Sequence, residues 1–210
     1  MKNNIPFRFY GITDRKRMIE SLFLSHLDRA VKAGLRALQI REKDLSPRAL
    51  YELTDKIRTI SATRRVRIFI NDRVDIAMAL DLDGVHLSTQ SMPTYNVRKL
   101  VGPDKLIGVS THDLHEAIHA ENEGADFIVI GPIGETRSKP KGHAVLSEKE
   151  FEIIREEVKI PIFVLGGVQT NNISHWLQKG AHGAAGISLL MDDENLEERF
   201  SNLKSTLGSL

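Results

Sequence analysis

Cationic and amide side chains follow a short apolar run near the start of the chain. Residues 37–40 are apolar apart from Gln39, and Arg41 and Lys43 come soon after them. Because successive side chains of a strand point to opposite faces, we expect Gln39, Arg41 and Lys43 on one side. Two cations and an amide donor placed together suit a phosphate or diphosphate group. An ordinary solvated strand end is the alternative, and these three residues alone do not exclude it.

A second polar pair follows the apolar run at residues 68–70. Asn71 and Asp72 offer an amide and a carboxylate, and hard oxygen ligands of this kind suit a magnesium ion that bridges a diphosphate. The same residue types also cap helices, and a helix is expected from Val74 to Leu80. A metal site and a helix cap both remain open for this pair.

Glycines follow the last two apolar runs. Gly166 and Gly167 come after the run at 162–165, and Ile187 and Ser188 end the run that begins at residue 183. Glycine lets the backbone approach an anion closely, and backbone N–H groups after the last two strands are the usual phosphate site of a (β/α)8 barrel. These positions therefore favour a phosphate site.

The longest expected loop, residues 131–143, contains two hydroxyls, three cations and three glycines. Such a loop could close over an anionic ligand. Loops are usually polar, however, so composition alone is weak evidence.

The elements that must position these residues alternate along the chain. Short apolar runs indicate buried parallel strands at 9–12, 37–40, 68–70, 84–87, 106–109, 127–130, 162–165 and 183–187. Helical spacing appears between them, for example at 22–31, 50–60 and 151–158. Ser46-Pro47 and the pair Ser147 and Glu150 are typical helix starts. Eight strands, each followed by a helix or a helical turn, predict an α/β fold, a (β/α)8 TIM barrel with one domain over residues 1–210. An open doubly wound sheet is the alternative, but no glycine-rich phosphate fingerprint follows the first strand.

Composition narrows the class of protein. A chain of 210 residues with 41% apolar and 27% charged residues is typical of a globular protein with one core. The net charge is +1 without a basic face, so neither nucleic acid nor an anionic membrane surface is an expected partner. No run reaches the roughly 18 apolar residues of a membrane span, and no signal peptide is visible, so we expect a cytoplasmic protein. Without cysteine there are no disulfides, and His112, His115 and His119 do not form a convincing zinc site.

Ordered segments along nearly the whole chain resemble the thiamine phosphate synthase family, which also contains thiazole tautomerases. The segments are YGITDR at 10–15, QIREKD at 39–44, INDRVD at 70–75, DGVHL at 83–87, GVSTH at 108–112, GPI at 131–133, GG at 166–167 and GAHG at 180–183. The resemblance implies a (β/α)8 barrel that joins an aminopyrimidine methyl diphosphate to a thiazole phosphate and releases diphosphate. It also implies Mg²⁺ as cofactor and phosphorylated small molecules as partners, and a homo-oligomer is compatible with it.

The resemblance implies roles for individual residues. The pyrimidine diphosphate would be held by Gln39, Arg41, Lys43, Asn71, Ser110 and Lys139, of which Arg41, Lys43 and Lys139 would act in catalysis by stabilising the leaving group. The thiazole phosphate would be held by Thr136, Ser138, Gly166, Gly167, Ile187 and Ser188. Asp72 would ligate magnesium, with Ser91 at the position of a second ligand.

Two positions depart from the family pattern. Ser91 replaces an Asp that binds magnesium in the synthases, and Pro132 stands where the tautomerases have a histidine that moves a proton. The prediction is a thiamine phosphate synthase, a transferase. The alternatives are a thiazole tautomerase-like isomerase and a non-catalytic protein that binds thiazole phosphate. Arg41, Lys43 and Asp72 argue against the last, because a thiazole phosphate binder needs no diphosphate site.

Overall fold

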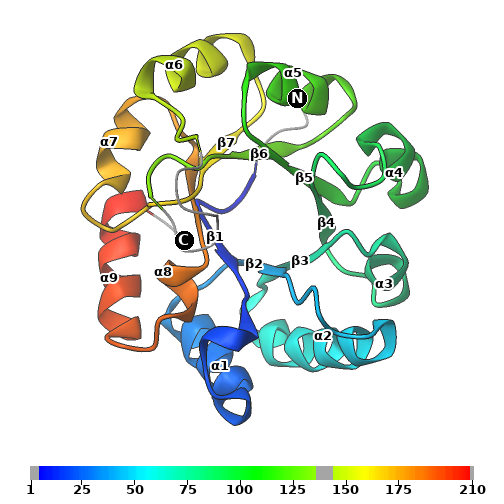
Figure 1. The fold of residues 1–210 in the computed structure, drawn as a ribbon. Coiled ribbons are helices and arrows are strands. Elements are labelled where there is room, and N and C mark those ends of the chain that lie inside the picture. Colours follow the sequence, from blue (N-terminus) through cyan, green and yellow to red (C-terminus); the bar gives the residue numbers. More distant parts are fainter. Residues whose placement is uncertain (1–4, 136–143, 209–210) are drawn as a thin grey trace.

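The strands form a closed parallel barrel in which each pairs with its sequence neighbours and the last pairs with the first (Figure 1). The structure is a computed structural model that describes residues 5–135 and 144–208. The strands are β1 (Phe9–Ile12), β2 (Ala37–Ile40), β3 (Arg67–Asn71), β4 (Gly84–Leu87), β5 (Leu106–Thr111), β6 (Phe127–Ile130), β7 (Ile162–Val164) and β8 (Gly183–Gly186). The predicted (β/α)8 barrel is confirmed.

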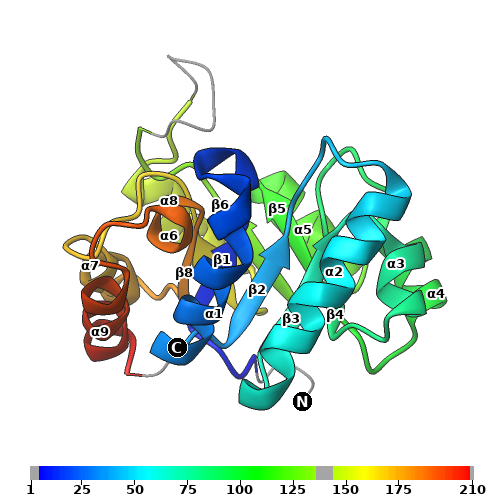
Figure 2. The same ribbon diagram turned by 90° about the horizontal axis from the view of Figure 1, so that it is seen from below.

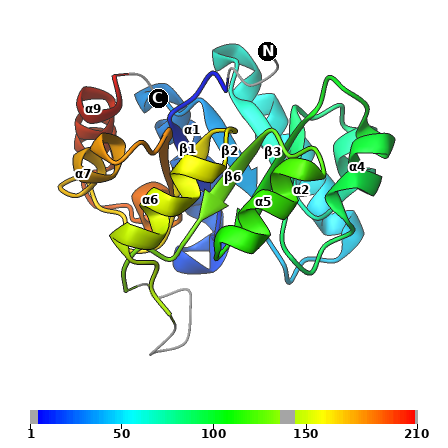
Figure 3. The ribbon, with the colours of Figure 1, turned by 90° about the horizontal axis from the view of Figure 1, so that it is seen from above.

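Helices surround the barrel and alternate with its strands. They are α1 (Phe23–Ala33), α2 (Pro47–Ser61), α3 (Val74–Ala79), α4 (Thr94–Val101), α5 (Leu114–Asn122), α6 (Glu148–Glu157), α7 (Ile173–Gln178), α8 (Ser188–Met191) and α9 (Leu196–Leu207). Short 3₁₀ turns are η1 (Arg15–Arg17), η2 (Glu20–Leu22) and η3 (Ala62–Arg64). Figure 2 shows α1 and α2 in front of the barrel, and Figure 3 shows α5 and α6 on the opposite side. No helix in the described ranges is long and apolar enough to cross a membrane.

The predicted helix starts are present as hydrogen-bonded caps. The Ser46 hydroxyl accepts from the backbone N–H of Ala49 at 3.3 Å, with Pro47 in the first helical position. Ser147 and Glu150 form a complete capping box at the start of α6. The helix expected from Val74 also begins there, but its cap position is Arg73 and no side chain caps it. The helix-cap interpretation of Asn71 and Asp72 is therefore wrong.

Two buried layers stabilise the barrel. The layer inside it is aromatic: Phe7, Tyr10, Phe69, Phe127 and Phe163 pack with ring centroids 5.2 to 6.3 Å apart. The other layer lies between the strands and the helices and consists mainly of Leu, Ile and Val side chains. The aromatic filling makes the interior a packed core, so a ligand can bind only at an end of the barrel.

Candidate functional site

A cavity of about 190 Å³ opens at the carboxyl ends of the strands. Its lining includes Gln39, Arg41, Lys43, Asn71 and Ser110, five of the residues predicted to bind substrate. Gln39, Arg41 and Lys43 thus reach one cavity, as the sequence predicts, although β2 ends at Ile40 and the two cations lie in the loop that follows it. Figure 2 shows the strands pointing upward, so this cavity lies at the end where the loops into η1 and α2 lie.

Arg41 and Lys43 are the cations of this cavity. Neither forms an ion pair with a carboxylate of the described residues, so both charges are available to an anion. The backbone N–H of Arg41 donates to the Thr13 hydroxyl at 2.9 Å. Between the two cations, Glu42 is buried and its carboxylate accepts from the backbone N–H of Arg15 at 3.1 Å. Burial raises the pKa of Glu42, and the hydrogen bonds from Thr13 and Arg15 oppose that shift.

A chain of polar contacts runs from β2 to the loop after β4. Gln39 Nε2 donates to Asn71 Oδ1 at 3.2 Å, and Asn71 Nδ2 donates to Asp72 Oδ2 at 2.7 Å. The Ser91 hydroxyl donates to the other carboxylate oxygen of Asp72. Asp72 has a backbone φ of 61°, a left-handed conformation that is costly for a residue other than glycine. Asp72 and Ser91, which were predicted together, are therefore in direct contact.

The donor set around Asp72 fits a magnesium ion. Carboxylate, hydroxyl and amide oxygens are hard ligands, and Mg²⁺ is commonly held by one or two carboxylates together with substrate phosphates. Asp72, Asn71 and Lys43 line a second cavity of about 290 Å³. Asn71 and Lys43 also line the first cavity. Ser91 instead lines a crevice of about 310 Å³ beside α5. Residues 5–135 and 144–208 contain no group of three or more His, Cys, Asp or Glu that could hold a metal.

Ser110 is connected to the barrel core through His86. His86 Nε2 lies 2.9 Å from Ser110 Oγ, and Nδ1 lies 3.4 Å from the Tyr10 hydroxyl. Tyr10 is buried with no other polar partner among the described residues, so its O–H is satisfied only by donating to Nδ1. His86 then donates through Nε2 to Ser110, which leaves the Ser110 proton for a ligand. Burial, and next the charge of Arg41, lower the pKa of His86 to about 3, so the ring is neutral.

A smaller cavity of about 40 Å³ adjoins the first and shares Leu165, Gly166 and Ile187 with it. Gly167 and Ser188 also line it. Gly166 and Gly167 have positive φ angles of 82° and 75°, which favour glycine. Within the described residues, the backbone N–H groups of Gly166, Gly167, Ile187 and Ser188 have no backbone acceptor. The predicted phosphate-binding residues of these two loops therefore share one cavity.

The remaining residues singled out in the sequence lie at the first cavity, elsewhere in the structure or outside its described part. Thr136, Ser138 and Lys139 lie in 136–143, outside the described residues. His115 and His119 are exposed on α5, as the sequence predicts. Pro132 lines the first cavity, where an isomerase of this family would need a base.

Arg17 and His86 are among the residues near the cavities that were not predicted as site residues. Arg17 lines the smaller cavity from the turn after β1, and no periodic pattern marks that turn. His86 was visible in the sequence as a lone polar residue inside the DGVHL strand. A histidine in the middle of an apolar run is a signal of a buried polar contact, because its ring needs hydrogen-bond partners.

Comparisons with known proteins identify the family of this chain. The sequence model of the family described as thiamine monophosphate synthase matches residues 9–190. The thiamine-phosphate synthase of Clostridium acetobutylicum is 36% identical over 196 residues, which cover 93% of this chain and 92% of that protein. A protein of Aquifex aeolicus, provisionally named thiamine-phosphate synthase 2, is 42% identical over 185 residues, or 88% of this chain and 98% of that protein. The structure of thiamine phosphate pyrophosphorylase from Pyrococcus furiosus superposes with a TM-score of 0.85, with 31% identity and 96% of each chain covered.

Proposed function

Because the chain belongs to the thiamine monophosphate synthase family, we propose that it is a transferase that makes thiamine phosphate. It joins 4-amino-2-methyl-5-pyrimidinylmethyl diphosphate to thiazole phosphate and releases diphosphate. The observation that carries the proposal is the pair of adjoining cavities. One contains amides and two cations without a carboxylate partner among the described residues, which suit a diphosphate. The other has backbone N–H groups without a backbone acceptor in that same part of the chain, which suit a phosphate. Two phosphorylated substrates side by side is what this condensation needs.

The reaction breaks the bond between the pyrimidine methylene carbon and the diphosphate oxygen, and forms a bond from that carbon to the thiazole nitrogen. Both electrons of the broken bond leave with diphosphate, so negative charge grows on the leaving group. Arg41 and Lys43 face that charge and stabilise it. The methylene carbon becomes a cation that the thiazole nitrogen captures, so the thiazole must already be aligned and water excluded. No protein nucleophile takes part in this sequence.

Asp72, with Asn71 and Ser91 around it, would hold a magnesium ion, which when bound helps to neutralise the leaving diphosphate. The Ser110 hydroxyl, oriented by neutral His86, donates a hydrogen bond into the diphosphate cavity. Lys139 would add a third cation, as the family resemblance implies. The expected cytoplasmic location and the oligomeric state stay predictions.

One observation favours a second candidate, a thiazole phosphate isomerase. His112 lines the first cavity, and its Nδ1 lies 2.9 Å from Oε2 of Glu116, which could orient the ring for proton transfer. Pro132 occupies the position expected for the base, so an isomerase would have to use His112 instead. The synthase reaction has no step for His112. His112→Asn should therefore keep thiamine phosphate formation, with at most a change in KM because His112 lines the cavity, whereas it should abolish an isomerase activity.

The test is an assay of thiamine phosphate after the purified protein is mixed with both substrates and magnesium. We expect formation of thiamine phosphate, and we expect Arg41→Ala to lower kcat about 100-fold, because a preorganised charge is lost at the leaving group. Arg48→Ala is a matched control, since Arg48 is exposed on α2 and pairs only with Glu52 among the described residues. No product at saturating magnesium, or equal rates for wild type and Arg41→Ala, would contradict the proposal.

A further inference from the structure

Arg17 reaches from the turn after β1 into the smaller cavity at the ends of β7 and β8. Its Nη1 donates to the Ser188 hydroxyl at 2.9 Å, and its Nε donates to Asp14 Oδ2 at 3.2 Å. The side chain is 19% exposed. Asp14 lies on the same turn, and its contact at Nε leaves the terminal nitrogens of the guanidinium toward Ser188.

The cavity supplies many donors but little charge without Arg17. Among the described residues that line it, Arg17 alone is charged; the others are glycine, alanine, serine and aliphatic residues. A second carboxylate, that of Asp192, has its Oδ1 3.8 Å from Nη1 and is farther from the guanidinium than that of Asp14. A phosphate monoester carries up to two negative charges, and backbone N–H groups alone do not neutralise them.

We propose that Arg17 binds the phosphate of the thiazole substrate, together with the backbone N–H groups of Gly167 and Ser188. The identity of this ligand rests on the proposed function. Arginine has five N–H donors, and two of them are engaged by Asp14 and Ser188, so donors remain for phosphate oxygens. Asp14 holds the guanidinium in place, which lowers the entropy lost when phosphate binds. The site thus joins loops from β1, β7 and β8.

A purely structural role predicts different behaviour. Arg17 would then only connect the β1 turn to the β8 loop through Ser188, and its loss would lower stability without a selective effect on phosphate. The two roles are separated by comparing a phosphorylated ligand with the same ligand lacking phosphate.

The experiment is calorimetric titration of wild type, Arg17→Gln and Arg17→Lys with thiazole phosphate, with the unphosphorylated thiazole alcohol and with inorganic phosphate. We expect Arg17→Gln to weaken thiazole phosphate and inorganic phosphate at least about 10-fold, the usual scale for a charged hydrogen bond. Arg17→Lys should recover part of that loss, and affinity for thiazole alcohol should stay unchanged. Lys16→Gln is the matched control, because Lys16 lies on the same turn but pairs with Asp44.

Each outcome has a defined meaning. Equal loss of affinity for thiazole phosphate and thiazole alcohol in Arg17→Gln, or no loss for either, would overturn the role of Arg17. Thermal unfolding of the same variants shows whether the fold is retained, and Arg17→Lys provides the answer if Arg17→Gln does not fold. If wild type binds inorganic phosphate through Arg17 but not thiazole phosphate, the proposed function fails while the phosphate site stands.

Discussion

The direction of the Ser110 hydroxyl depends on a histidine that stays neutral. Burial, and next the charge of Arg41, lower the pKa of His86 to about 3, compared with about 6.5 in an unfolded chain. Between these values the unfolded state binds a proton that the folded state does not. Stability from His86 is therefore present above pH 6.5 and is lost as pH falls toward 3.

The difference in the pKa of His86 between the folded and unfolded states predicts that the free energy of unfolding changes measurably with pH. From His86, the free energy of unfolding should fall by up to about 1.4 kcal/mol per pH unit between pH 6 and pH 4. Urea unfolding at several pH values should show a shallower slope for His86→Gln than for wild type. His115→Gln, at an exposed position on α5, should keep the wild-type slope. Equal slopes in wild type and His86→Gln would show that His86 takes up its proton in the folded state as readily as in the unfolded one.

In the proposed function, Ser91 affects how tightly magnesium would be held. Its hydroxyl accepts from the Ser88 backbone N–H at 2.7 Å and donates to Asp72. Ser91→Asp would place a second carboxylate beside Asp72, which attracts a dication and, without one, repels Asp72. We expect the variant to need several-fold less magnesium for half-maximal rate, and its melting temperature to be lower without magnesium and restored by it.

Thr89→Asp is the control for this change, because Thr89 is an exposed residue of the same loop. It adds the same charge without a contact to Asp72 among the described residues. Identical magnesium responses of wild type and Ser91→Asp would show that position 91 does not face the ion.

Sequence alone could predict the residues that a regular element places, and it missed those placed by contacts between elements. Gln39 points to the cavity from β2, and Arg41 and Lys43 reach the same cavity from the loop directly after that strand. Arg17 lies on a three-residue 3₁₀ turn, which is too short to have a periodic pattern. Its contact with Ser188 joins positions 171 residues apart, and no local rule predicts such a pair.

At the scale of elements, β4 and β5 need glycine where large side chains fill the barrel, at Gly84 and Gly108. The register of β3, β4 and β5 places Asn71 beside His86 and His86 beside Gly108. A Cβ at Gly108 would lie 2.7 Å from Cε2 of Phe127 and 2.8 Å from Nδ1 of His86. Gly108 thus makes room for the ring that orients Ser110.

Gly108→Ala should therefore destabilise the protein and disturb the site. We expect a loss of about 1–3 kcal/mol in the free energy of unfolding, the usual cost of overpacking a core, and a lower kcat from the displaced His86. Urea unfolding and the thiamine phosphate assay measure the two effects. Gly134→Ala is the control for stability, because a Cβ there would meet its nearest neighbour, Gly167 Cα, at an ordinary 3.4 Å. Stability equal to wild type in Gly108→Ala would show that the core yields easily.

Strands and longer helices were predictable because burial on both faces gives the strands continuous apolar runs, and burial on one face gives the helices a period. β3 begins one residue earlier than its apolar run, at exposed Arg67, and β5 extends past its run to Thr111. Polar residues at strand ends can still pair with the neighbouring strand, because the hydrogen bonds between strands are made by backbone groups. Helix α8 has four residues, too few for a helical stripe, so only a helical turn could be expected after β8.

At the scale of the whole molecule, a barrel closes only if the first and last elements of the chain meet. β1 pairs with β8 through Phe9, Tyr10 and Gly11, and the ring of Phe9 packs edge-on against Phe200 of α9 at 5.7 Å. Figure 1 shows α1 and α9 as neighbours on the outside of this seam. Contacts across the seam therefore stabilise the closed barrel and, with it, the smaller cavity built from the loops after β1, β7 and β8.

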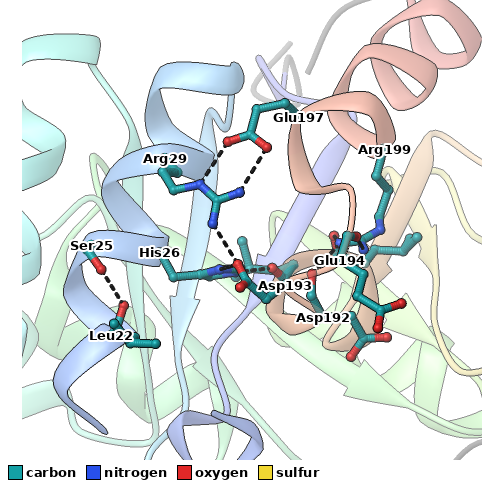
Figure 4. Close-up of polar contacts among 11 residues, drawn as sticks. Leu22, Ser25, His26, Arg29, Asp192, Asp193, Glu194, Glu197 and Arg199 are labelled. Atoms are coloured by element: carbon teal, nitrogen blue, oxygen red, sulfur yellow. Dashed lines mark hydrogen bonds and ion pairs between the residues drawn. The ribbon is translucent and has the colours of Figure 1, made fainter. Parts of the chain in front are cut away.

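Figure 4 shows the polar part of the seam, where α1 faces the segment between α8 and α9. His26 is buried, and its Nε2 donates to the Leu190 carbonyl at 2.7 Å while Nδ1 lies 3.1 Å from Asp193 Oδ1. Arg29 is more exposed and donates to Asp193 at 2.6 Å and to Glu197 at 2.8 Å. The hydrogen bonds from Arg29 lower the pKa of Glu197 to about 2.

His26 and Arg29 should contribute very differently to the stability of the closed barrel. His26→Leu keeps apolar packing but leaves the buried Leu190 carbonyl without its donor, so we expect a loss of about 1–3 kcal/mol in the free energy of unfolding. Arg29→Gln removes more ion-pair contacts, yet it should change stability little, because exposed pairs are screened by water and salt. Urea unfolding measures both, and faster amide hydrogen exchange in α9 of His26→Leu would place the loss at the seam. A larger loss for Arg29→Gln than for His26→Leu would mean that surface charge, and not the buried histidine, closes the barrel.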